Sequence, residues 1–189
     1  MRLDYDHLCE ALRDRHPSPS MDSGLRPAAV MLLLVDRPET HLLLIQKTLT
    51  EGYPWSGQIA LPGGMIHTED STPLAAAVRE VEEELGIDAA ALRILGYVGP
   101  FRTQITAVEV HAFAARWSGG TGLTPDRREV AEVFEVDLDR LLSSRSTDAQ
   151  DERSTDLEIR FGVEGRTIWG LTARMLEALL QVLRRPVRT

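Results

Sequence analysis

Three glutamates, Glu80, Glu83 and Glu84, are spaced so that a helix would bring them onto one narrow face. On a helix turning about 100° per residue, Glu83 and Glu84 fall about 60° and 40° to either side of Glu80. Like charges at these spacings destabilise an exposed helix, so the pattern needs compensation. Carboxylate oxygens suit Mg²⁺ or Mn²⁺, ions that also coordinate substrate phosphates. The pattern predicts a divalent-metal site, with a solvated acidic helix face as the alternative.

A helix that ends at Gly86 would position these carboxylates. Ser71 or Thr72 is a candidate N-cap, Pro73 suits the first turn, and Gly86 suits the C-terminal stop. The adjoining helix face is apolar and would pack on a sheet, whereas Glu82 points elsewhere. The apolar residues are Leu74, Ala77, Val78, Val81 and Leu85. Residues 50–64, rich in Gly and Pro, predict a preceding loop whose backbone carbonyls can approach a cation.

The block GGMIHTEDSTPLAAAVREVEEELGI, residues 63–87, resembles the Nudix box. REVEEELGI at 79–87 matches the second half of that motif. In the first half, Asp70 stands where the family commonly has Glu, and eight residues separate it from Arg79 where the common box has seven. Both departures are typical of the coenzyme A pyrophosphatase-like branch of Nudix hydrolases. Further blocks at 56–64, 129–136 and 168–176 look like that branch, so the resemblance covers roughly residues 28–183.

The resemblance implies a set of metal ligands and catalytic residues. Glu80, Glu83, Glu84 and the carbonyl of Gly63 would bind Mg²⁺ or Mn²⁺. The catalytic group would be Glu83, Glu84 and Arg79. The general base would be one of the helix glutamates or a late acid, for which Glu129 and Glu132 are the candidates. Arg79 would orient the glutamates, with Asp70 or Glu69 as its partner.

The implied reaction is hydrolysis of the diphosphate in a nucleoside diphosphate derivative, coenzyme A-like by resemblance. Metal ions would neutralise the pyrophosphate and activate a water for in-line attack. The alternatives are a Nudix hydrolase of ADP-ribose, nucleotide sugars, dinucleotides or nucleoside di- and triphosphates, and a Nudix module that binds a nucleotide without cleaving it. Such modules commonly lose box glutamates, whereas this sequence has all three.

The stretch before the box contains candidate substrate-binding residues. Lys47, with Thr48, can stand for the Arg-Ser pair of the coenzyme A branch if one residue is gapped. The further basic residue of that branch is absent, and Tyr53 lies nearest its place. Tyr53 and Trp55 would stack on a base or pack within the loop. Arg102 would contact phosphate or ribose, or be a solvated loop residue.

Composition limits the partners. With 21 basic and 29 acidic residues the net charge is −8, the wrong sign for a general nucleic-acid coat or a polybasic membrane binder. Cys9 is the single cysteine, which excludes an intrachain disulfide and a thiolate zinc cage. The apolar runs are too short to cross a bilayer, and the N-terminus lacks the pattern of a signal peptide.

We expect a cytoplasmic protein with a small nucleotide substrate and without nucleic-acid or membrane partners. A homodimer stays open, because Nudix proteins are often dimers.

The remaining pattern predicts one α+β or α/β domain over residues 1–189, and the resemblance implies the α+β Nudix fold, an α/β/α sandwich in which helices flank a mixed sheet. Residues 1–27 would form a short helix and a connector, and 170–184 an amphipathic C-terminal helix. Strands are expected at 28–35 and 41–45 around a tight turn, and again across 92–117. A strand and short helix would follow in 129–142, a mobile loop in 143–156 and a hairpin in 157–169.

Overall fold

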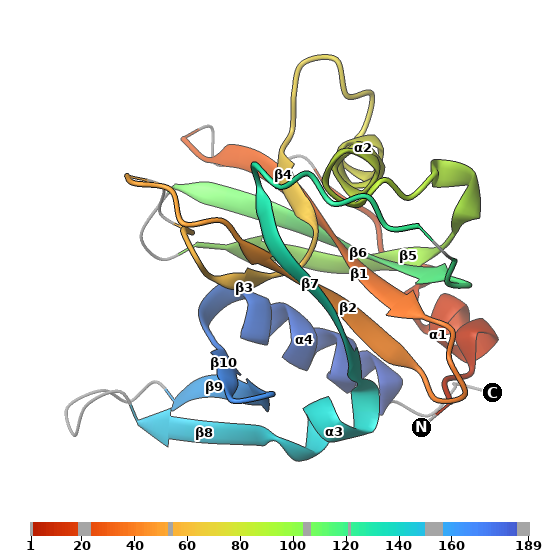
Figure 1. The fold of residues 1–189 in the computed structure, drawn as a ribbon. Coiled ribbons are helices and arrows are strands. Elements are labelled where there is room, and N and C mark those ends of the chain that lie inside the picture. Colours follow the sequence, from red (N-terminus) through yellow and green to blue (C-terminus); the bar gives the residue numbers. More distant parts are fainter. Residues whose placement is uncertain are drawn as a thin grey trace.

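The helix that carries the three glutamates lies on one face of a mixed β-sheet in the computed structural model of the chain (Figure 1). The structure describes residues 2–18, 24–52, 55–103, 107–120, 122–149 and 157–184. Within these ranges the main sheet has seven strands, with β3, β2, β1, β6 and β5 side by side in that order, while β4 pairs with β1 and β7 with β2. The strands are β1 (Arg26–Val35), β2 (His41–Lys47), β3 (Ile59–Ala60), β4 (Gly63–Met65), β5 (Leu92–Arg102), β6 (Val108–Trp117) and β7 (Val130–Asp137).

Helices cover both faces of this sheet, which confirms the predicted α+β fold with a flanked mixed sheet (Figure 1). Helix α2 (Pro73–Leu85) packs on one face, and α1 (Tyr5–Leu12) and α4 (Gly170–Leu183) pack on the other. A second, three-stranded sheet is formed by β8 (Arg145–Ala149), β9 (Leu157–Val163) and β10 (Arg166–Ile168). The short helices are α3 (Leu138–Ser143) and a 3₁₀ turn, η1 (Ala89–Ala91). None of the helices in the described ranges is long and apolar enough to cross a membrane.

The continuous apolar run of β1 is explained by burial on both faces. Met31 and Leu33 lie in the core under α2, while Leu32 and Leu34 lie in the core under α4. A strand covered on both faces needs apolar side chains at every position, so strict alternation is lost. The predicted pairing with β2 is also present, and Leu33 lies opposite Leu43 in an antiparallel register.

Two expectations about loops were wrong. Residues 50–64 contain β3 and β4, and β4 pairs with β1 through Gly63 opposite Val30. Of the tract 143–156, expected to be a mobile loop, Arg145–Ala149 forms strand β8 against β9, and residues 150–156 lie outside the described residues. In both cases pairing with another strand, β1 for β4 and the following strand β9 for β8, overrides a local composition of Gly, Pro or Ser.

Candidate metal and catalytic site

The residues at the two ends of α2 determine where this helix begins and where it ends. Thr72 is the N-cap, and its hydroxyl accepts a hydrogen bond from the Ala75 N–H at 3.0 Å. Pro73 occupies the first turn, and Gly86 ends the helix with a left-handed φ of 69°, a conformation that favours glycine. These signals, recognised in the sequence, determine which residues face the sheet.

Packing of the apolar face carries part of the acidic stripe into the interior. Glu80 is 8% exposed and Glu84 is 1% exposed, whereas the side chain of Glu83 is 59% exposed. Glu82 lies on the outer side, where its carboxylate accepts a hydrogen bond from the Ala89 N–H at 2.9 Å. The stripe therefore has two buried carboxylates and one that faces solvent, which a wholly solvated acidic face would not have.

Strand β4 brings backbone atoms against these carboxylates because its first two residues are glycines. The Gly63 N–H donates to Glu84 Oε2 at 2.9 Å. A Cβ added at Gly64 would lie 2.5 Å from Glu80 Oε1, and one at Gly63 would lie 2.4 Å from the Ala29 carbonyl oxygen. Side chains at either position would push the strand away from α2 or from β1.

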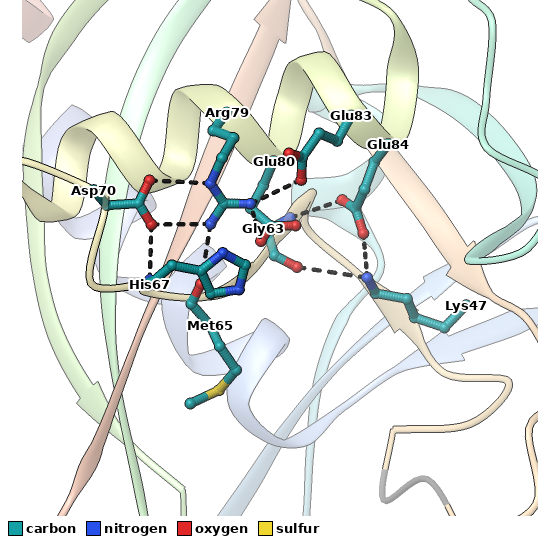
Figure 2. A network of polar contacts seen from close by, with 9 residues as sticks. All are labelled: Lys47, Gly63, Met65, His67, Asp70, Arg79, Glu80, Glu83 and Glu84. Atoms are coloured by element: carbon teal, nitrogen blue, oxygen red, sulfur yellow. Dashed lines mark hydrogen bonds and ion pairs between the residues drawn. The ribbon is translucent and has the colours of Figure 1, made fainter.

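Arg79 ties the loop before α2 to two of the glutamates (Figure 2). Its Nη1 donates to Glu80 Oε1 at 2.9 Å and to Glu83 Oε2 at 2.8 Å. Its Nε and Nη2 each donate to one oxygen of Asp70 at 3.0 Å. Of the two partners expected for Arg79, the structure therefore selects Asp70. Hydrogen bonds from Arg79 and from the His67 N–H lower the pKa of Asp70 to about 2.

Lys47 approaches the same cluster from the end of β2. Its ammonium forms an ion pair with Glu84 Oε1 and lies 3.5 Å from the Gly63 carbonyl oxygen (Figure 2). Lys47 is 7% exposed. This candidate substrate-binding residue is thus placed among the candidate metal ligands, on a carboxylate.

Burial and neighbouring charge oppose each other in this cluster. Burial raises the pKa of Glu84, and the ammonium of Lys47 and the Gly63 N–H act in the opposite direction. Burial likewise raises the pKa of Glu80, against the effect of Arg79. The network contains four carboxylates and two cations: Asp70, Glu80, Glu83, Glu84, Arg79 and Lys47. With all six groups ionised it has two net negative charges, which one divalent cation would neutralise.

The donors fit a hard divalent cation in chemical type, since they are carboxylate and carbonyl oxygens gathered around β4 and α2. Among the described residues, no three Asp, Glu, His or Cys side chains converge on a common point. The contacts explain this, because Glu80 and Glu83 are turned toward Arg79 and Glu84 toward Lys47. Metal loading would require at least one of these carboxylates to exchange its cationic partner.

The other predicted site residues are more scattered. Glu129 is exposed, and its carbonyl oxygen accepts from the Thr48 N–H at 3.0 Å, next to Lys47. Glu132 pairs with Arg166 at 2.6 Å. Trp55 is half-buried and packs against the core on the α4 side of the sheet, and Tyr53 lies outside the described residues. Arg102, at the end of β5, donates to Glu109 Oε1 at 3.2 Å.

The segment that covers the C-terminal end of α2 was not predicted from the sequence. The Asp126 N–H donates to the Glu84 carbonyl oxygen at 3.0 Å, and the Thr124 N–H donates to that of Leu85 at 2.9 Å. Asp126 also pairs with Arg128, which lowers its pKa to about 2. An Asp two residues before an Arg and directly after Pro125 was the available signal for a turn. The segment satisfies carbonyl groups at the helix end and leads into β7 beside β2.

Comparison with known proteins finds related sequences. A model of the NUDIX domain family matches residues 25–157. The chain is 31% identical over 168 residues to a protein named Uncharacterized Nudix hydrolase NudL from Photorhabdus laumondii, covering 87% of this chain and 89% of that protein. It is 30% identical over 190 residues to the protein of the same name from Klebsiella pneumoniae, covering 97% of each.

A solved structure shares the fold. The crystal structure of a MutT/nudix family protein from Enterococcus faecalis aligns with a TM-score of 0.55 at 16% identity, covering 90% of this chain and 71% of that one. Nudix hydrolases generally use divalent metal ions and act on pyrophosphate bonds, the enzyme class expected from the box. By its sequence and its fold, this chain belongs to the Nudix hydrolase family.

Proposed function

We propose that this chain is a Mg²⁺- or Mn²⁺-dependent pyrophosphatase that hydrolyses the diphosphate of a nucleoside diphosphate derivative. The observation that carries the proposal is the gathering of the three box glutamates between α2 and β4, where Arg79 donates to Glu80 and Glu83 and the Gly63 N–H donates to Glu84. A binding module without catalysis would not need to keep all three carboxylates.

Within this proposal Glu80, Glu83, Glu84 and the Gly63 carbonyl would hold the metal. The bound metal would supply charge neutralisation at the pyrophosphate and a lowered pKa of its water. Arg79, held by both oxygens of Asp70, orients Glu80 and Glu83. Gly64 leaves room for the Glu80 carboxylate to lie over the strand. Glu129, which is exposed next to the end of β2, is the candidate general base.

We further propose that the substrate is coenzyme A or a related adenosine diphosphate derivative. The support is the Asp70 form of the box with its longer spacing to Arg79, together with the similar blocks around it. Lys47 and Arg102 are the candidate phosphate ligands, and Tyr53 and Trp55 the candidate base-stacking residues. The missing basic residue near Tyr53 favours the alternative substrates, namely ADP-ribose, nucleotide sugars, dinucleotides and nucleoside di- or triphosphates. The acidic balance and the single cysteine fit a cytoplasmic protein with a small-molecule substrate.

The test is hydrolysis of a substrate panel with Mg²⁺ or Mn²⁺ and with a chelator, with products identified by mass. Cleavage of coenzyme A to 4′-phosphopantetheine and 3′,5′-ADP supports the first substrate, and cleavage of the other nucleotides alone supports the alternative. Glu84→Gln serves as the inactive control. Nucleotide binding without turnover in either metal would replace the enzyme by a binding module.

A further inference from the structure

We propose that Lys47 is an internal counter-ion of the metal-free site, and that a divalent metal must displace its ammonium from Glu84 in order to bind. The inference rests on the proposed function, because it takes Glu84 and the Gly63 carbonyl as metal ligands. It adds a competitor that sets the metal affinity of this chain.

The position of Lys47 supports this role. Its backbone is held on two sides, since its N–H donates to the Gln58 carbonyl oxygen at 3.0 Å and it lies opposite Val130 in β7. From there the ammonium reaches Glu84 Oε1 and the Gly63 carbonyl oxygen, two of the expected metal-ligand atoms (Figure 2). The ammonium thus contacts at once two oxygens that the proposed function assigns to the metal.

Burial makes this contact necessary when metal is absent. Glu84 is 1% exposed, and a buried carboxylate without a partner is strongly destabilising. The Gly63 N–H satisfies one oxygen at 2.9 Å, and Lys47 provides the positive charge on the other. A divalent ion on the same oxygens would be repelled by the ammonium, so the two cations compete.

The second cation of the network behaves differently. Arg79 is anchored by Asp70, outside the expected ligand set, through two hydrogen bonds of 3.0 Å. It can keep orienting Glu80 and Glu83 when metal binds. By contrast, both contacts of the Lys47 ammonium described above are to expected metal ligands. The ammonium is carried by a flexible four-carbon side chain, which allows it to move away from them. Once displaced, the ammonium becomes available to a phosphate oxygen, which fits the substrate-binding role expected for Lys47 from the sequence.

Lys47 is also the single lysine of the 189-residue sequence, whose other 20 basic residues are arginines. An ammonium is a compact point charge, whereas a guanidinium is a planar fork. The compact group suits a site between one carboxylate and one carbonyl that must also admit a metal ion. The single lysine allows a direct experiment, because lysine labelled with ¹³C at Cε gives one side-chain NMR signal.

The first measurement follows that signal in the full-length, metal-stripped protein during a Mg²⁺ titration. We expect the Lys47 Cε signal to shift and to saturate with the same midpoint as Mg²⁺ binding measured by calorimetry. A signal that stays unmoved while Mg²⁺ binds would overturn the proposal. This measurement needs no variant, so it does not depend on whether a substitution is tolerated.

The second measurement compares Mn²⁺ affinity of the wild type, Lys47→Met and Lys47→Arg from the electron paramagnetic resonance signal of free Mn²⁺. We expect Lys47→Met to bind Mn²⁺ about tenfold more tightly, or about 1.4 kcal/mol. Lys47→Arg keeps the positive charge, so it should not show this gain in affinity. Metal-free Lys47→Met should melt below the wild type and gain more in Tm from Mn²⁺. Equal Mn²⁺ affinity in the wild type and Lys47→Met would contradict the competition between Lys47 and the metal, while leaving the proposed metal site intact. Failure of all three proteins to bind Mn²⁺ would instead contradict the proposed function.

Discussion

Two regions of this molecule differ in how their residues are held. One is the box region, residues 63–87, and the other is the substrate side, which comprises the candidate substrate-binding residues outside the box. In the box region one helix and one short strand bring these groups together: Arg79 donates to Glu80 and Glu83, and the Gly63 N–H donates to Glu84. On the substrate side, Trp55 and Arg102 come from separate segments and contact different neighbours, whereas the candidate substrate residue Lys47 pairs with Glu84 of the box region. Residues on one helix keep their relative positions through its period, whereas residues on separate segments depend on how those segments pack. We therefore expect box variants to reduce kcat and substrate-side variants to change KM.

The largest effect is expected from Glu83→Gln and Glu84→Gln. Each removes a carboxylate charge from the metal site, and turnover should fall at least about a hundredfold because metal stabilisation of the transition state is worth several kcal/mol. Steady-state kinetics with Mg²⁺ measure the loss, and thermal melting checks the fold. Glu82→Gln is the matched control, since the amide oxygen can still accept from the Ala89 N–H, and it should be nearly silent. Equal losses in all three variants would contradict the model of one metal-binding stripe.

Asp70→Asn should have the next largest effect. The neutral amide cannot hold the Arg79 guanidinium by two charged hydrogen bonds, so Glu80 and Glu83 lose their orientation. We expect a loss of about 10- to 100-fold in activity or metal affinity, as for other residues that support metal ligands. Asp126→Asn is the control, because Asp126 also pairs with an arginine, but Arg128 is 88% exposed and such pairs contribute little. If Asp126→Asn matched Asp70→Asn in activity, Arg79 anchoring would not be the cause.

Trp55→Ala tests the substrate side and separates two roles. If Trp55 stacks on the base, KM should rise about tenfold with kcat little changed, since base stacking contributes about 1–3 kcal/mol. If the ring instead completes the core on the α4 side of the sheet, Tm should fall while KM stays constant. Kinetics on the preferred nucleotide together with a thermal melt distinguish these outcomes. A fall in kcat alone would break the division between the two regions.

A smaller effect is expected from Arg102→Ala. Its side chain is 55% exposed and paired with Glu109, so a phosphate contact by this arginine would be made in water. We expect KM to rise about threefold or less, because exposed ion pairs are worth about 0–1 kcal/mol. A rise above about thirtyfold would place β5 within the substrate site.

Acid titration gives the smallest expected change and tests the Asp70 anchor without kinetics. The pKa of the Asp70 carboxyl group is about 2 in the folded protein, against about 3.9 for Asp in unfolded chains. A depressed carboxyl pKa contributes stability that is present above about pH 4 and is lost as pH falls toward 2. In the Asp70→Asn variant the free energy of unfolding should therefore fall less between about pH 4 and 2 than it does in the wild type, as measured by urea unfolding. A fall identical to that of the wild type would show that Asp70 does not stabilise the fold through Arg79.

The same division between regions governs what could be predicted. Helix α2 was predicted with its cap, its stop and its buried face, because Thr72, Pro73 and Gly86 act within a few residues of the helix. Strands β4 and β8 were missed, because Gly and Ser are poor strand formers and the pairing comes from β1 and β9. The segment around Asp126 was missed for a similar reason, since its role appears only when it lies against the end of α2.

The sequence alone determined the box helix, the shared face of its three glutamates, the family and the core strands β1 and β2. These features depend on periodicity and on capping, which operate over one to three helical turns or along one strand. Tertiary packing decided which glutamates are buried, that Asp70 rather than Glu69 holds Arg79, and that the Lys47 ammonium lies on Glu84. Burial, pKa and ion pairing depend on groups brought together from distant parts of the chain, and sequence spacing does not encode that proximity.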